Sequence, residues 1–101
     1  MDSKYEVIFS EKVDSQIDNA LDYIRVNLSN PTAAKKLHEK INDNVKYLKI
    51  SPYLFPVSRI EGCRQCPVDN YLLFFEIDES QKHVNVLYFY HGSQDYEALW
   101  K

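Results

Sequence analysis

Apolar residues recur at two different spacings along the chain, and the change of spacing separates a helical first half from a strand-rich second half. In the first half they step by three or four residues, as in the buried stripe of an amphipathic helix. The first stripe consists of Val13, Ile17, Ala20, Leu21, Ile24 and Leu28. Ser10 is a suitable N-cap for this helix, and Tyr5 to Phe9 before it has the β-branched and aromatic residues of a short strand.

A second helix is predicted from Pro31 to about Ile50. Pro31 suits the first position of a helix and disfavours helical geometry at the residue before it, so it separates the two helices. The apolar stripe of this second helix consists of Ala34, Leu37, Ile41, Val45 and Leu48. Because the connection is short, the two helices are expected to form an antiparallel hairpin.

The residues after position 50 favour strands. Ser51 to Pro56 contains two prolines, which cannot continue the helix, and this segment predicts an irregular loop with aromatic anchors. A strand is expected either at Val57 to Ile60 or at Gln65 to Val68, with Glu61-Gly62 as a turn between them. Tyr71 to Ile77 is almost continuously apolar, which is typical of a central strand buried on both faces.

The last strand is predicted at His83 to His91, joined to the central strand as a hairpin by the polar residues Asp78 to Lys82. Strict alternation places Val84, Val86, Tyr88 and Tyr90 on one face and Leu87 and Phe89 on the other. The order predicts an α+β fold in a single domain, residues 1–101. An N-terminal strand and an antiparallel two-helix hairpin pack on one face of a three- to four-stranded, mainly antiparallel sheet, and a short helical segment, Ser93 to Trp100, follows.

Composition supports a compact domain and excludes several classes of protein. The 101 residues are 45% hydrophobic and 27% charged and include only two glycines and four prolines, which argues against disorder and low complexity. No apolar stretch approaches the ~20 residues that cross a bilayer, so no membrane association is expected. The first residues lack the apolar core of a signal peptide, and a cytoplasmic location is therefore expected.

The formal net charge of −3 is unevenly distributed. Residues 1–30 hold three basic and six acidic groups, whereas residues 31–50 hold five lysines against two acidic residues. The aspartates of the first helix are expected on a solvated face, and the basic second helix suits a nucleic acid or an acidic protein. Overall acidity disfavours long-range attraction to nucleic acid, so a role with nucleic acid requires a local basic patch.

Cys63 and Cys66 have the C-x-x-C spacing of metal and redox motifs, but their context favours two ordinary thiols near a sheet edge. A structural zinc site needs four ligands, and only the scattered His38, His83 and His91 remain to complete the pair. The pair leads toward a strand, not to the helix N-terminus that lowers the pKa of a reactive dithiol. A local disulfide is the alternative, and no metal or cofactor is expected.

His91 and two arginines are the residues best suited to chemistry. His91 ends a strand close in sequence to Asp95 and Tyr96, and a histidine there can act as a general acid or base, or simply terminate the strand. Arg59 and Arg64 precede the central strand, where guanidinium groups suit recognition of phosphate or carboxylate or pair with neighbouring acids.

The ordered motifs resemble the RelE/ParE superfamily of bacterial toxin-antitoxin toxins from Tyr5 to Leu99. After the strand-helix-helix order, the resemblance is carried by Ser51-Pro52-x-x-x-Pro56, Arg64-x-x-Pro67-Val68-x-Asn70-Tyr71-x-x-Phe74-Phe75-x-Ile77-Asp78 and His91-Gly92-x-x-Asp95-Tyr96. The resemblance implies a small cytoplasmic toxin that a cognate antitoxin wraps and neutralises. It also implies one of two activities, since ParE-like members poison DNA gyrase and RelE-like members cut messenger RNA on the ribosome without a metal.

Two departures favour the ParE-like branch. Leu72 follows the central-strand tyrosine, where the ribonucleases often carry an arginine, and Gln94 stands where an arginine is usual after the last strand. Without these guanidinium groups, a phosphorane transition state loses much of its electrostatic stabilisation. The leading prediction is therefore a ParE-like inhibitor of DNA gyrase.

Two alternatives remain open, and whether the protein is an enzyme depends on them. The first is a metal-independent, ribosome-dependent mRNA endonuclease in which Arg64, His91 and Tyr96 are catalytic. The second is a non-toxic protein-binding module. Contacts with a partner or target are expected from Arg59, Arg64, Tyr71, Gln94, Asp95, Tyr96 and Trp100. A free sheet edge or helix face would also support a homodimer.

Overall fold

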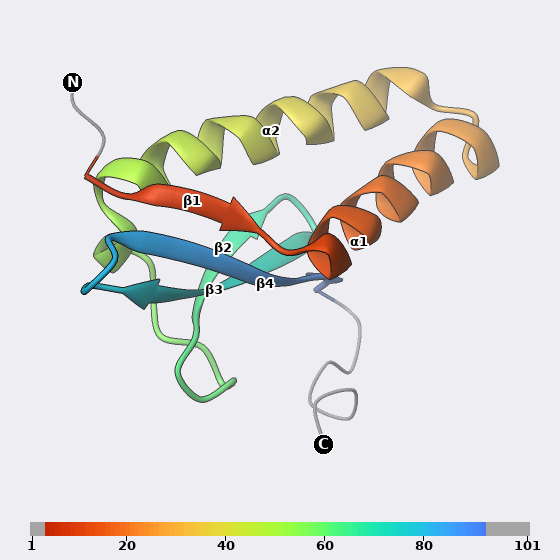
Figure 1. Cartoon of the computed structure of the whole chain (residues 1–101). Helices are drawn as coiled ribbons and strands as arrows, with labels where there is room; N and C mark the ends of the chain where they lie inside the picture. Colours follow the sequence, from red (N-terminus) through yellow and green to blue (C-terminus); the bar gives the residue numbers. More distant parts are fainter. Residues whose placement is uncertain (1–3, 93–101) are drawn as a thin grey trace.

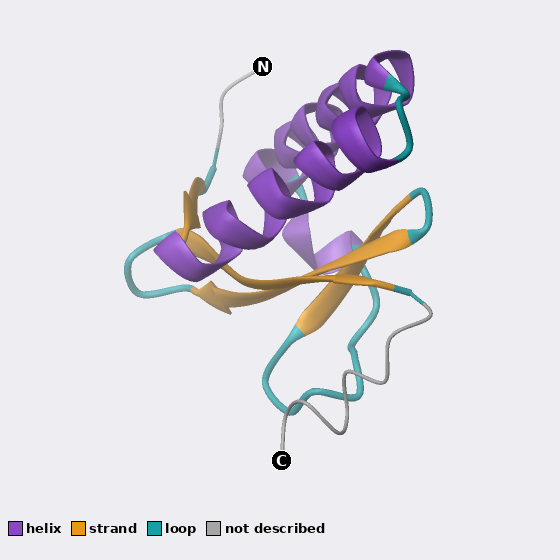
Figure 2. Ribbon diagram, turned by 90° about the vertical axis from the view of Figure 1, so that its right-hand side faces the viewer, coloured by secondary structure: helices purple, strands orange, loops and turns teal. Residues whose placement is uncertain are grey.

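The computed structural model describes residues 4–92, which form a four-stranded sheet with both helices on one of its faces (Figures 1 and 2). The elements in chain order are β1 (Glu6–Phe9), α1 (Glu11–Asp22), a π-helical segment (Tyr23–Asn27), α2 (Pro31–Ile50), a 3-10 turn (Pro52–Leu54), β2 (Arg64–Val68), β3 (Tyr71–Asp78) and β4 (His83–His91). The predicted α+β fold is confirmed. The predicted C-terminal helical segment lies outside the described residues.

The sheet has the strand order β1-β4-β3-β2, in which β1 is parallel to β4 and the other neighbours are antiparallel. The β3–β4 hairpin at the centre confirms the prediction. Of the two segments expected to supply a further strand, the later one forms β2, and Val57 makes only an isolated bridge to Arg64. Gly62 has a φ of 81° in the predicted turn, a left-handed conformation that favours glycine.

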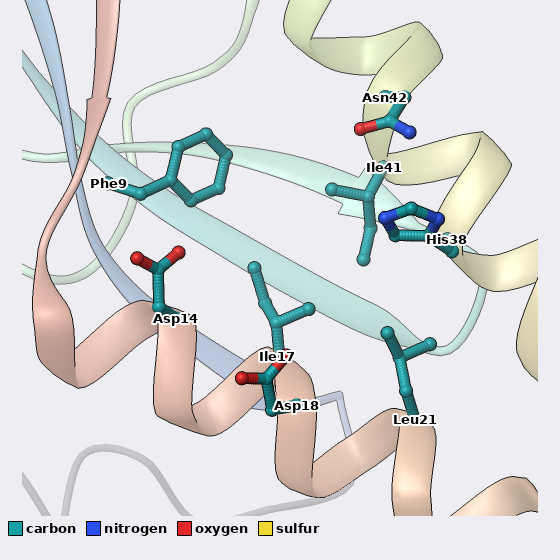
Figure 3. Close-up of a pocket in the computed structure, with 8 residues that line it drawn as sticks. All are labelled: Phe9, Asp14, Ile17, Asp18, Leu21, His38, Ile41 and Asn42. Atoms are coloured by element: carbon teal, nitrogen blue, oxygen red, sulfur yellow. The ribbon is translucent and has the colours of Figure 1, made fainter.

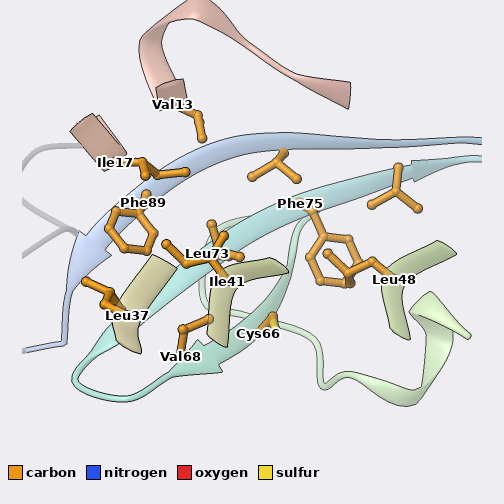
Figure 4. Close-up of a cluster of buried hydrophobic side chains, with 12 residues drawn as sticks. Val13, Ile17, Leu37, Ile41, Leu48, Cys66, Val68, Leu73, Phe75 and Phe89 are labelled. Atoms are coloured by element: carbon orange, nitrogen blue, oxygen red, sulfur yellow. The ribbon is translucent and has the colours of Figure 1, made fainter. Parts of the chain in front are cut away.

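The main core lies between the two helices and the sheet (Figure 4). Leu73 and Phe75 of β3 have no exposed surface there, and the equally buried Leu48 of α2 lies beside Phe75. Phe55 contributes an edge-on ring contact with Phe75, at 6.0 Å between centroids, which confirms the aromatic anchoring predicted for the loop after α2. None of the helices within residues 4–92 is long and apolar enough to span a bilayer.

A second, smaller cluster covers the opposite face of the sheet. Phe74 of β3 is fully buried there with Ile60, Cys63 and Tyr90. The residues between α2 and β2 reach this face because the chain loops around the edge of the sheet before it enters β2 (Figures 1 and 2). The prediction that the central strand is buried on both faces is therefore confirmed.

The predicted alternation along β4 is wrong beyond Val86. Phe74 pairs with Tyr88 and Phe75 pairs with Val86, so Leu87 is one extra residue in β4. Such a bulge reverses the faces of every later residue. Val86 and Phe89 therefore share the main core, whereas Tyr88 joins the cluster on the opposite face.

The prediction that Leu28 belongs to the buried stripe of the first helix is also wrong, since 55% of its surface is exposed. α1 changes to a π-helix at Tyr23, and the Leu28 N–H donates to the Tyr23 carbonyl five residues earlier. The wider turn inserts an extra residue, so the stripe ends at the partly buried Ile24. The helix hairpin consequently has an apolar tip, at which Tyr23, Val26 and Leu28 are more than half exposed.

Both helices begin with side-chain caps. The Ser10 hydroxyl accepts from the Val13 N–H at 3.2 Å, which confirms the predicted cap of α1. Asn30, a cap that is not among the predicted ones, begins α2 by accepting from the Ala33 N–H at 3.0 Å. Pro31 occupies the first turn of α2, as predicted, because its missing N–H needs no partner there.

Candidate functional site

Arg64 lies at the start of β2, where its guanidinium group holds the loop after α2. It donates to the carbonyl of Phe55 at 2.7 Å and to that of Tyr53 at 3.4 Å, and it lies 5.1 Å from the centre of the Tyr53 ring. The geometry therefore gives this arginine a structural task. Arg59, the other arginine of the predicted contact set, is exposed in the segment before β2.

His91 and Tyr71 lie side by side at the far end of the β3–β4 hairpin. They are register partners, and their rings meet edge to face at 5.1 Å. Tyr71 also stacks on Phe89 at 4.8 Å, and burial raises the pKa of its phenol. A cavity of about 330 Å³ opens beside these rings, with Gln16 of α1 also in its lining.

The structure does not bring Arg64 and His91 together. Arg64 is opposite Phe75 in the sheet and His91 is opposite Tyr71, so four residues of β3, about 13 Å of strand, separate the two positions. Four further predicted site residues lie outside the described residues: Gln94, Asp95, Tyr96 and Trp100.

The two cysteines are free thiols on opposite sides of the sheet. Cys66 faces α2 in the main core, where burial raises the pKa of its thiol to about 12, and it donates to the Asn44 side-chain oxygen at 3.4 Å. Cys63 belongs to the second cluster, and burial raises its pKa as well. The prediction of ordinary thiols near a sheet edge is confirmed, since β2 is an edge strand.

The face of the sheet away from the helices carries an apolar patch beside the exposed Glu76 of β3, whose carboxylate accepts from the Asn85 side chain of β4 at 3.4 Å. Leu72, Leu87 and Tyr88 are half-buried there and pack against the second cluster. The Lys12 ammonium lies 4.8 Å from the centre of the Tyr88 ring. This surface, which we call the open sheet face and define by these three half-buried side chains, is suited to contact with a protein.

A groove runs between α1 and α2 on the helical side of the molecule (Figure 3). Ile17 and Leu21 of α1 and Ile41 of α2 point into it, and Phe9 closes one end. The edges of the groove carry polar side chains. We call this surface the interhelical groove, and its full lining is Phe9, Asp14, Ile17, Asp18, Leu21, Arg25, Pro31, Ala34, Lys35, His38, Ile41 and Asn42.

A hydrogen-bonded cluster at the β3–β4 turn was not found from the sequence. The Glu79 carboxylate accepts from the phenols of Tyr5 and Tyr53, at 2.5 and 2.7 Å, and from the Lys82 ammonium. These bonds lower the pKa of Glu79 to about 2. Since its members come from the N-terminus, the loop after α2 and the turn, the cluster ties three distant segments together. No local sequence signal marks these contacts.

Comparisons with known proteins give one family and one shared fold. Residues 7–96 match the family described as the ParE toxin of type II toxin-antitoxin systems, parDE. A structure of a chromosomal ParDE toxin-antitoxin system from P. aeruginosa aligns over 87% of this chain and 96% of the other, with a TM-score of 0.74 at 20% identity. No curated protein sequence matches this chain.

RelE structures resemble the chain less closely. The archaeal RelE-RelB complex from Pyrococcus horikoshii OT3 has a TM-score of 0.60 at 13% identity and covers 90% of this chain and 98% of that one. The isolated E. coli RelE toxin has a TM-score of 0.56 at 14% identity, covering 95% and 96%. At these identities the structural likeness establishes the shared fold.

Proposed function

The chain is a toxin of the ParE family of type II toxin-antitoxin systems, and from this premise we propose that it arrests growth by binding and inhibiting DNA gyrase. The observation that carries the proposal is the apolar patch of the open sheet face. A ribonuclease of this superfamily is expected to gather cationic and proton-transferring side chains on the sheet. Leu72, Leu87 and Tyr88 instead offer a surface that suits a protein.

Electrostatics support the same conclusion. Cleavage of RNA passes through a phosphorane that needs preorganised donors and positive charge within hydrogen-bonding distance. Arg64 directs its guanidinium group to the carbonyls of Phe55 and Tyr53, and His91 lies at the other end of the strands. Two of the three expected catalytic residues, Arg64 and His91, are thus divided between two ends of the sheet, and the third, Tyr96, lies outside the described residues.

The interhelical groove supports a second part of the proposal, that a cognate antitoxin binds between α1 and α2. A toxin of a two-component system needs a partner surface that is separate from the surface that meets its target. The groove has an apolar floor and exposed polar edges, which is the form that receives an amphipathic helix. A cytoplasmic location is part of this proposal, because gyrase acts on DNA in the cytoplasm.

Two assays with the purified chain test the target. In the first, gyrase supercoils a relaxed plasmid in the presence of increasing toxin, and we expect supercoiling to stop. In the second, a translating extract receives the same toxin, and we expect its messenger RNA to remain intact. Cleaved messages with normal supercoiling would overturn the proposal in favour of the ribonuclease.

A pair of matched variants tests the open sheet face. Leu72→Glu places a charge on this face, whereas Leu54→Glu makes the same change on a loop residue that is 83% exposed. Because central interface residues account for most of the affinity, we expect Leu72→Glu to raise the inhibitory concentration at least about tenfold. Leu54→Glu should leave it unchanged. Circular dichroism confirms folding, and equal inhibition by both variants would exclude the open sheet face as the gyrase contact.

A further inference from the structure

We infer that the interhelical groove is charged in opposite senses at its two ends and so accepts its partner in one direction, as an amphipathic helix parallel to α1 with a basic N-terminal half and an acidic C-terminal half. The inference rests on the proposed function, since it describes the antitoxin segment that binds in this groove. It goes beyond that function by giving the charge pattern and the direction of the bound helix.

The groove is long enough for a short helix. It consists of two cavities of about 240 and 280 Å³, which share Leu21 and His38 in their linings and are therefore continuous. Along α1 the lining extends from Asp14 to Arg25, and at 1.5 Å per residue this is about 16 Å, or three helical turns. A partner of about eleven residues can thus lie along its whole length.

The charges at the two ends are opposite. Asp14 and Asp18 are exposed at the end next to β1, and neither makes an ion pair with another described residue. Lys35 and Arg25 line the end next to the hairpin connection, where Arg25 also pairs with Asp22. Figure 3 shows Asp14 and Asp18 along the α1 edge of the first cavity. The sign of the charge therefore changes along the groove.

This arrangement selects the occupant and its direction. A helix carries partial positive charge at its N-terminus and partial negative charge at its C-terminus, and complementary side chains add to the effect. The N-terminal half of the partner is thus favoured beside the two aspartates and its C-terminal half beside Lys35. A strand of nucleic acid is disfavoured, because its phosphates would meet Asp14 and Asp18 above an apolar floor.

Charge-reversal variants of the full chain test the inference, with the protein encoded beside the toxin gene as the probe. Asp18→Lys reverses the acidic end, and Asp43→Lys makes the same change of charge on α2 outside the groove lining. Lys35→Glu and its control Lys46→Glu form the second pair. Exposed ion pairs are individually weak, so we expect each groove variant to raise the Kd about fivefold or more and each control less than twofold.

Spin labels determine the direction. A nitroxide on the N-terminal end of the bound antitoxin helix should broaden the amide signal of Asp18, and one on the C-terminal end should broaden that of Lys35. The opposite pattern would overturn the inference, and so would equal effects of groove and control variants on the Kd. Both of these results leave binding and gyrase inhibition intact, whereas a chain that neither inhibits gyrase nor binds the probe refutes the proposed function itself.

Discussion

The hydrogen bond between Gln16 and the backbone of β4 allows the sharpest test of how α1 supports the sheet. β1 pairs with β4 only as far as Phe9 opposite Val86, and beyond that point α1 covers the edge of β4. The side-chain oxygen of Gln16 accepts from the Phe89 N–H at 2.9 Å. Phe89 is only 3% exposed, and the bond is partly buried. Gln16→Ala should remove this acceptor from the amide of Phe89.

The expected cost follows from this burial. A buried donor that loses its partner costs about 1–3 kcal/mol in the free energy of unfolding. For a domain of this size, each 1 kcal/mol lowers the melting temperature by about 4–8 °C, so Gln16→Ala should lower it by roughly 5–20 °C. Gln16→Glu keeps an acceptor at the same place and should retain most of the stability at neutral pH. Asn19→Ala, an exposed amide on the same helix, is the matched control.

Urea unfolding followed by circular dichroism measures the free energies of unfolding, and hydrogen exchange reports directly on the Phe89 amide. We expect this amide to exchange faster in Gln16→Ala than in either other variant. If Gln16→Ala and Asn19→Ala have the same stability within about 0.5 kcal/mol, the bond contributes nothing and the account of the β4 edge is wrong.

Three further predictions concern stability and reactivity. Glu79→Gln should lower the melting temperature at neutral pH, because folding lowers the pKa of Glu79 from 4.5 to about 2. The ionised carboxylate therefore stabilises the fold fully above about pH 4.5. The difference in melting temperature between Glu79→Gln and the unmodified protein should disappear as the pH falls to about 2. Leu73→Ala should cost about 2–5 kcal/mol in urea unfolding because Leu73 is fully buried, whereas Leu28→Ala should change stability by less than about 0.5 kcal/mol because Leu28 is exposed. Cys66 should resist a thiol reagent at pH 8 in the folded protein and react once urea unfolds it, since burial raises its pKa to about 12; rapid reaction of the folded protein would contradict its burial.

The helices and strands were predictable because their signals are local. Pro31 separates the two helices, Ser10 caps the first, and the period of the apolar residues distinguishes helix from strand. Leu28 was predicted on the wrong face of the helix because a π-helical turn interrupts the helical period at Tyr23. No residue of the apolar stripe predicts this turn. Tyr88 was predicted on the wrong face of the sheet because a bulge depends on how two strands pair, and the sequence of one strand does not predict it.

The candidate site was less predictable than the fold. Arg64 and His91 were identified as residues suited to chemistry, but their separation depends on the register of β2 and β3. The aspartates of the first helix were expected on a solvated face, and only the packing of α1 against α2 places Asp14 and Asp18 at the edge of a groove. The opposite charges at the two ends of that groove come from side chains of both helices, so neither helix alone predicts them.

The sequence by itself determined the order of the elements, the α+β class and the superfamily, because these depend on local periodicity and on motifs read in order. Only the tertiary structure decided which side chains meet. Gln16 and Phe89 are 73 positions apart, and Tyr5 and Glu79 are 74 apart. Such contacts form because the chain folds back on itself to bury apolar surface. The partly buried Phe89 N–H then needs a partner where the backbone places it, whereas the exposed Tyr5 and Glu79 side chains meet because the fold brings their segments together. The apolar patch of the open sheet face and the charged ends of the interhelical groove arise in the same way, from residues that the fold alone makes neighbours.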